Sequence, residues 1–135
     1  MKTMYVVAGL TAFLVAGIVF AQSESDYQGW MKSNGAAMGS LQKNIAAKDA
    51  SGIAADAHTI EGNLKNAEAF WTKKGGAPDA VNFAKMGQMA AATLAKDATG
   101  NMDAVAGDLK SLQGNCGGCH MAHREKTESG FKFKQ

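Results

Sequence analysis

Mostly apolar residues recur at spacings of three and four in four stretches of the chain, which places their side chains on one face of a helix. The first stripe consists of Tyr27, Met31, Asn34, Met38, Leu41 and Ile45, and the second of Ile53, Ala57, Ile60, Leu64, Ala67 and Trp71. The third consists of Val81, Phe83, Met86, Ala90 and Leu94, and the fourth of Met102, Val105, Leu109, Leu112, Cys116, Cys119 and His123. No stretch shows the sustained alternation typical of a strand. The pattern predicts four amphipathic helices.

Residues typical of helix ends separate the stripes. Ser25 is a candidate cap of the first helix, and Gly75 with the glycine after it ends the second. Pro78 suits the first turn of the third helix, and Asn101 is a candidate N-cap of the fourth. We therefore expect an all-α fold, an antiparallel four-helix bundle joined by short loops, and a frayed tail from Thr127 onward. The expected helices lie near 24–47, 50–74, 78–97 and 101–126.

The first 21 residues follow a different pattern. Lys2 precedes an apolar stretch from Met4 to Phe20, which ends at Ala21 before the polar run "QSESD". This layout predicts a secretory signal peptide over 1–21, cleaved after Ala21, and export to the periplasm. An uncleaved membrane anchor is the alternative, but the small residue at the expected cleavage site favours removal. The mature chain, 22–135, is expected to be a single domain.

Charge and hydropathy argue against nucleic acid and membrane as partners of the mature chain. The chain has 14 basic and 12 acidic residues, and removal of Lys2 leaves 13 basic ones. No basic stripe stands out, so nothing favours nucleic-acid binding. No second apolar run is long enough to span a membrane, so no membrane contact is expected after signal removal.

Both cysteines lie in a single short run, "GNCGGCHMAHRE", within the predicted fourth helix. Cys116, Cys119 and His120 stand at positions i, i+3 and i+4, which share one face of a helix. A C-x-x-C-H run is typical of c-type haem attachment. In that chemistry each thiol adds across a haem vinyl group to form a thioether, and the imidazole reaches the iron from the same side.

Two other chemistries compete for this run. A thioredoxin-like redox disulfide would be expected near a βαβ pattern, and this chain has no strand signal. A zinc ion could recruit Cys116, Cys119, His120 and His123, but structural zinc sites usually draw ligands from two separate elements. The spacing therefore favours haem. Three glycines, Gly114, Gly117 and Gly118, stand in the same helix, and a porphyrin lying close to the backbone would explain them.

The run "CGGCHMAHR" in the last helix of an exported four-helix bundle resembles the class II cytochromes c, which include cytochrome c′ and its low-spin relatives. The resemblance covers nearly all of the mature chain. It implies one covalent haem c, with Cys116 and Cys119 as the thioether sulfurs and His120 as the proximal iron ligand. Family members often have a basic residue four positions after this histidine, and Arg124 holds that place near the haem.

The stretch "YQGWMKSNGAAMGSL" resembles the family's first helix, which crosses the distal face of the haem. An apolar residue blocks the sixth iron position in cytochrome c′, whereas a methionine binds iron there in the low-spin members. Met31 aligns with that position, and Met38, two turns further on, is its rival. The family commonly has an arginine that contacts a haem propionate where this chain has Tyr27.

The resemblance implies a monohaem electron-transfer protein with His and Met ligands, acting with redox partner proteins that the sequence does not identify. A five-coordinate cytochrome c′ that binds nitric oxide is the alternative, with Met31 only lining the pocket. A zinc-stabilised binding module is the third reading. Nothing in the sequence argues for catalysis, so we do not expect an enzyme. Many family members pair through helices, which makes a homodimer compatible with this reading.

Overall fold

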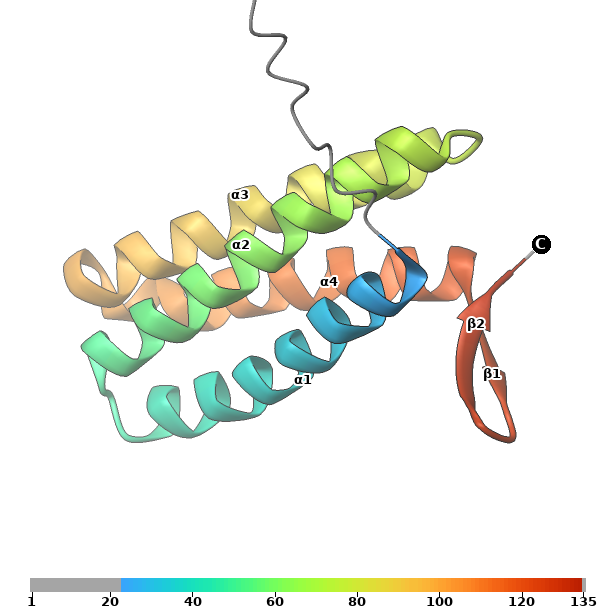
Figure 1. Ribbon diagram of the computed structural model, residues 1–135. Helices are drawn as coiled ribbons and strands as arrows, with labels where there is room; N and C mark the ends of the chain where they lie inside the picture. The colour runs from blue at the N-terminus through green and yellow to red at the C-terminus, as the bar shows by residue number, and fades with distance from the viewer. Residues whose placement is uncertain (1–22, 135) are drawn as a thin grey trace, which may run out of the picture.

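The computed structural model describes residues 23–134, which form four long helices followed by a short β-hairpin (Figure 1). The signal peptide expected over 1–21 and the new N-terminus expected at Gln22 lie outside the described residues. Among residues 23–134, no helix has the length and apolar character needed to cross a lipid bilayer. The elements are α1 (Glu24–Ala46), α2 (Ala50–Lys74), α3 (Pro78–Gly100), a 3-10 turn η1 (Met102–Ala104), α4 (Val105–His123), β1 (Arg124–Thr127) and β2 (Gly130–Phe133).

The four predicted helices are present, and local residues explain where most of them begin and end. The first cap is Ser23 rather than Ser25, because the Ser23 hydroxyl accepts a hydrogen bond from the Asp26 amide and the Asp26 carboxylate accepts one from the Ser23 amide. Gly75 ends α2 at a φ of +74°, a backbone conformation that glycine adopts without a steric cost. Pro78 occupies the first turn of α3, as expected.

The helices run in alternating directions, so each is antiparallel to the next along the chain (Figure 1). α1 packs against α2, α2 against α3, and α3 against α4. No comparable packing joins α1 to α4. The bundle is therefore closed on three sides and has a seam between its first and last helices.

Buried side chains form two separate clusters. The larger one is aliphatic and includes Leu41, Ile53, Ile60, Leu94 and Leu112, which are completely buried. The second is mainly aromatic and contains Tyr27, Phe70, Trp71 and three alanines. Cys116 packs against the aliphatic cluster and Cys119 against the aromatic cluster. The C-x-x-C-H turn of α4 thus lies where the two clusters meet.

The C-terminal segment differs from the expectation of a long helix with a frayed tail. α4 ends at His123, and Arg124 adopts an extended conformation that starts an antiparallel β-hairpin. Phe133 of β2 packs against Tyr27, Phe70 and Trp71, with ring centroids 5.1, 5.6 and 5.1 Å away. The aromatic contact stabilises the tail as an ordered hairpin, because the segment then buries a side chain that a frayed tail would expose.

Candidate functional site

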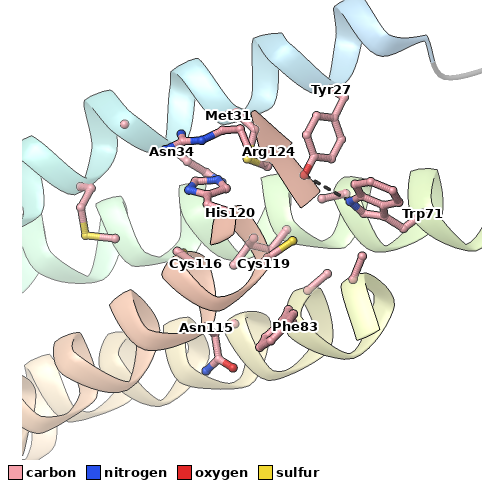
Figure 2. Close-up of a pocket in the computed structure, with 17 residues that line it drawn as sticks. Tyr27, Met31, Asn34, Trp71, Phe83, Asn115, Cys116, Cys119, His120 and Arg124 are labelled. Carbon is pink, nitrogen blue, oxygen red and sulfur yellow. Dashed lines mark hydrogen bonds between the residues drawn. The ribbon is translucent and has the colours of Figure 1, made fainter. Parts of the chain in front are cut away.

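A cavity of about 240 Å³ lies inside the bundle, with walls from all four helices (Figure 2). Each residue proposed from the sequence as a haem contact lines this cavity. The set comprises Met31 and its rival Met38 on α1, Cys116, Cys119 and His120 on α4, and Arg124 at the start of β1. Residues almost 90 positions apart in the chain therefore surround one space, which the sequence pattern alone could not establish.

The two thiols lie on successive positions of one face of α4, as the i and i+3 spacing predicts. Both cysteines are free and partly buried. Burial raises the pKa of Cys116, and it raises the pKa of Cys119 to about 11, with further contributions from Cys116 and Asp79. Both side chains are therefore neutral thiols at pH 7. Reactive redox cysteines have a depressed pKa instead, so these thiols do not resemble a disulfide-exchange site.

His120 follows on the same turn and also faces the cavity. Burial lowers the pKa of its imidazole, and the positive charge of Arg124 lowers it further. A neutral imidazole has a free nitrogen lone pair, which is the form that binds a metal ion. The position and charge state of His120 are both suitable for a ligand to iron.

His123, the fourth residue of the zinc alternative, lies elsewhere. Its Nε2 is 2.8 Å from Oδ2 of Asp79 in the first turn of α3, and its ring packs against Trp71 at a centroid distance of 5.0 Å. Across residues 23–134, no three His, Cys, Asp or Glu side chains come together as a metal site. The structure therefore gives the two cysteines and His120 no further protein ligand for zinc.

The wall opposite His120 is formed by α1. Met31 packs against the aromatic cluster and Met38 against the aliphatic cluster, so the two thioethers lie at different ends of the cavity. Asn34 lies between them, and its side-chain oxygen accepts a hydrogen bond of 2.9 Å from Asn63 of α2. The sequence pattern placed Asn34 on the helical stripe of the first helix. It could not predict this hydrogen bond, because the partner residue lies in another helix.

Two aromatic residues that the sequence presented mainly as core residues also line the cavity. Trp71 donates a hydrogen bond of 3.2 Å from its Nε1 to the Tyr27 hydroxyl (Figure 2). Burial raises the pKa of Tyr27 to about 12, against the lowering effect of the Trp71 hydrogen bond. Tyr27 therefore keeps its hydroxyl proton throughout the physiological pH range. The apolar spacing predicted burial of both residues, but no local signal predicted their hydrogen bond.

Phe83 of α3 explains one of the three glycines in the motif. A Cβ atom added to Gly118 would lie 2.6 Å from the Phe83 ring, which is closer than such atoms normally approach. Added Cβ atoms at Gly114 and Gly117 would have no neighbour within 4 Å among the described residues. A glycine at position 118 therefore leaves room for the ring of Phe83. Phe83 lines the cavity, whereas Gly118 does not.

The lining of the cavity is mainly apolar. It includes no Asp or Glu, and Arg124 is its one residue of fixed charge. Its volume is below the roughly 300–1,000 Å³ of common ligand pockets. The backbones of α1 and α4 make few close approaches, and buried side chains of both helices, among them Leu41 and Leu112, meet in the aliphatic cluster. The donor set, two thiols and an imidazole facing a thioether, matches the requirements of a covalently attached haem.

Comparisons with protein-family models, with characterised proteins and with solved structures found no match to this chain.

Proposed function

We propose that the protein is an exported monohaem c-type cytochrome of the class II type that transfers electrons. One observation carries the proposal. Cys116, Cys119 and His120 occupy one wall of an internal cavity, and Met31 lies on the wall that faces them. Thioether formation at the two cysteines would fix the haem to α4, while His120 and Met31 would bind its iron from opposite sides.

Each residue has a distinct role in this proposal. The Cys116 and Cys119 thiols would hold the haem by adding across its two vinyl groups, with one S–H bond and one vinyl π bond replaced by one C–S and one C–H bond at each cysteine. His120 would hold the iron through its imidazole lone pair, and Met31 would supply a soft thioether, which favours Fe(II) over Fe(III) and would raise the reduction potential. The bound haem supplies the one-electron redox chemistry. The two buried clusters pack around Met31, Cys116 and Cys119 and would hold these ligands in place.

A second function is favoured by the packing of Met31. Its side chain contacts the aromatic cluster, which could hold it there rather than on the iron. The iron would then be five-coordinate and open to nitric oxide or carbon monoxide, as in cytochrome c′. The zinc and disulfide alternatives have less support, because His123 is bonded to Asp79 and burial raises the pKa of both thiols.

Intact mass measurement tests the proposal directly. The full gene is expressed in a bacterial host that can attach c-type haem, and the purified protein is weighed after denaturation. We expect the mass of residues 22–135 plus one haem, and a reduced absorption spectrum typical of two thioether links. Replacement of both Cys116 and Cys119 by Ala should abolish the covalent adduct. A wild-type chain that loses its haem in acidified organic solvent would contradict covalent attachment.

The oxidised spectrum then separates the two functions. Ligation by His120 and Met31 gives low-spin iron with the weak sulfur-to-iron band in the far red. A high-spin spectrum at neutral pH, with rapid binding of carbon monoxide after reduction, would support the gas-binding function instead.

A further inference from the structure

A polar side chain lies between the two methionines in the α1 wall of the cavity. Asn34 follows Met31 by three residues and precedes Met38 by four, so the three side chains share one face of the helix, and all three line the cavity (Figure 2). The other lining residue between the two methionines is Gly35, which has no side chain. The wall that faces His120 therefore carries one amide group next to the methionine proposed as the sixth iron ligand.

A residue of α2 fixes the orientation of this amide. Nδ2 of Asn63 donates one hydrogen bond of 2.9 Å to Oδ1 of Asn34 and another of 3.0 Å to the hydroxyl oxygen of Ser33. Both N–H donors of the Asn63 amide are then used. The Asn34 amide cannot turn over, because its own N–H donors would then face those of Asn63. Its oxygen is therefore held toward α2, and its Nδ2 occupies the other edge of the group.

Nδ2 of Asn34 is left free to bind a ligand. The hydrogen bonds of this amide within residues 23–134 use its oxygen and not its nitrogen. Over the same residues, the one side-chain nitrogen or oxygen that is sealed from solvent without a partner is Oδ2 of Asp108. Nδ2 of Asn34 is therefore not sealed, and it borders open space, which for this half-buried residue is the cavity. In a mainly apolar cavity, such a donor needs an acceptor on the group that occupies the cavity.

We propose that Asn34 donates a hydrogen bond to the ligand at the sixth iron position and that Asn63 is the residue that positions it. This inference rests on the proposed haem function. With Met31 on the iron, the acceptor is its sulfur, which accepts hydrogen bonds weakly. With the position open, the acceptor is the far atom of a diatomic ligand. Hydrogen-bond donors around the open side of a haem influence which ligands it binds, so Asn34 determines specificity at this position.

Carbon monoxide is the probe for this donor, and Met31→Ala is the background because it opens the sixth position. An N–H donor next to the carbonyl oxygen lowers the C–O stretching frequency, which infrared spectroscopy of the reduced holoprotein measures. Adding Asn34→Leu, which keeps the size but removes the donor, should raise this frequency. Asn115→Leu is the matched control: Asn115 also lines the cavity, but its Nδ2 donates a 3.0 Å hydrogen bond to the Ser111 carbonyl oxygen. The control should leave the frequency unchanged.

Two further variants in the same background test the positioning and guard against misfolding. Asn63→Ala leaves the Asn34 amide free to rotate, so the C–O band should broaden and move part of the way toward that of the Asn34→Leu variant. Asn34→Ala removes the donor without adding bulk, and it decides the question if the leucine variant fails to bind haem or carbon monoxide. In the chain that retains Met31, Asn34→Leu should also shift the far-red sulfur-to-iron band, whereas Asn115→Leu should not.

The failure of this inference differs from the failure of the proposed function. A chain without covalent haem gives no carbonyl band in any variant, which would overturn the function and the inference together. A haem-loaded Met31→Ala protein whose C–O frequency stays the same after Asn34→Leu and Asn34→Ala would overturn the role of Asn34 alone and leave the cytochrome function in place.

Discussion

Met31 and Met38 both line the cavity from α1, about 10 Å apart along the helix axis at the usual rise of 1.5 Å per residue. Only one of them can lie opposite His120. Met31 and Cys119 both pack against the aromatic cluster, and His120 directly follows Cys119, so we expect Met31 to bind the iron. Met31→Ala should open the sixth position, raise the spin state, lower the reduction potential and allow carbon monoxide to bind readily. Absorption spectra and a redox titration measure these effects.

Met38→Ala is the matched control, because it removes the other cavity thioether from the same face of the same helix. It should keep the low-spin spectrum and cost stability through the cavity that it creates, by about 2 kcal/mol for a partly buried methionine. The reverse outcome, in which Met38→Ala turns the iron high-spin and Met31→Ala does not, would assign the ligand to Met38.

Gly118 and Gly114 offer a second matched pair within α4. Gly118→Ala places a methyl group against the Phe83 ring and should destabilise the holoprotein by about 1–3 kcal/mol through overpacking. Gly114→Ala meets no neighbour and should stabilise it by about 0.5–1 kcal/mol through helix propensity. Guanidinium unfolding followed by circular dichroism measures both. Equal effects at the two positions would mean that Phe83 moves aside without cost.

At the scale of elements, we expect Phe133 of the hairpin to contribute more to the stability of the fold than Phe131 does. Phe133→Ala removes a ring that contacts three aromatic residues, and we expect a loss of about 2–3 kcal/mol in the free energy of unfolding. Phe131→Ala removes a ring that is 52% exposed and should cost less than about 1 kcal/mol. Thermal unfolding of the two holoproteins compares them. A loss from Phe131→Ala as large as that from Phe133→Ala would contradict this division.

The elements differ in how far the sequence could predict them. The boundary between α2 and α3 was predictable because Gly75 and Pro78 impose local backbone constraints that do not depend on the rest of the fold. The end of α4 was not, since residues 124–129, directly after His123, include no glycine or proline that would stop the helix. The hairpin forms because Phe133 packs against the aromatic cluster. Strand formation of this kind depends on packing more than on the intrinsic strand preference of the residues.

The same distinction applies to the site. The C-x-x-C-H spacing on a helical face was enough to predict that Cys116, Cys119 and His120 share a surface. The position of Met31 across from them required an alignment to a family pattern. The hydrogen bond between Trp71 and Tyr27 and the stacking of Phe131 on Arg124 could not be predicted, because each joins two elements whose relative positions only the fold defines.

At the scale of the whole molecule, the haem-free chain should be poorly ordered. The haem would fill the centre of a bundle whose small residues, such as Ala84 and Gly87, bury little apolar surface by themselves. α1 should loosen first, since α2 is the only helix whose backbone it approaches closely over its length. Calorimetry and amide hydrogen exchange on a variant lacking both cysteines, prepared without haem, measure this. A cooperative transition at the temperature of the holoprotein would be the contrary result.

The seam between α1 and α4 should make the stability of the protein depend on its redox state. If Met31 and His120 bind the iron as proposed, the iron would add a link across that seam to the side-chain packing of the aliphatic cluster, and the thioethers would keep the haem on α4 even in the unfolded chain. The proposed Met31–iron bond would then form only in the folded state, and it would be stronger in Fe(II). By thermodynamic linkage, each 59 mV by which folding raises the potential adds about 1.4 kcal/mol to the stability of the reduced protein over the oxidised one. Reduction should thus strengthen the attachment of the first helix to the bundle, and oxidation should weaken it. Unfolding curves of the two redox states measure this difference in the free energy of unfolding.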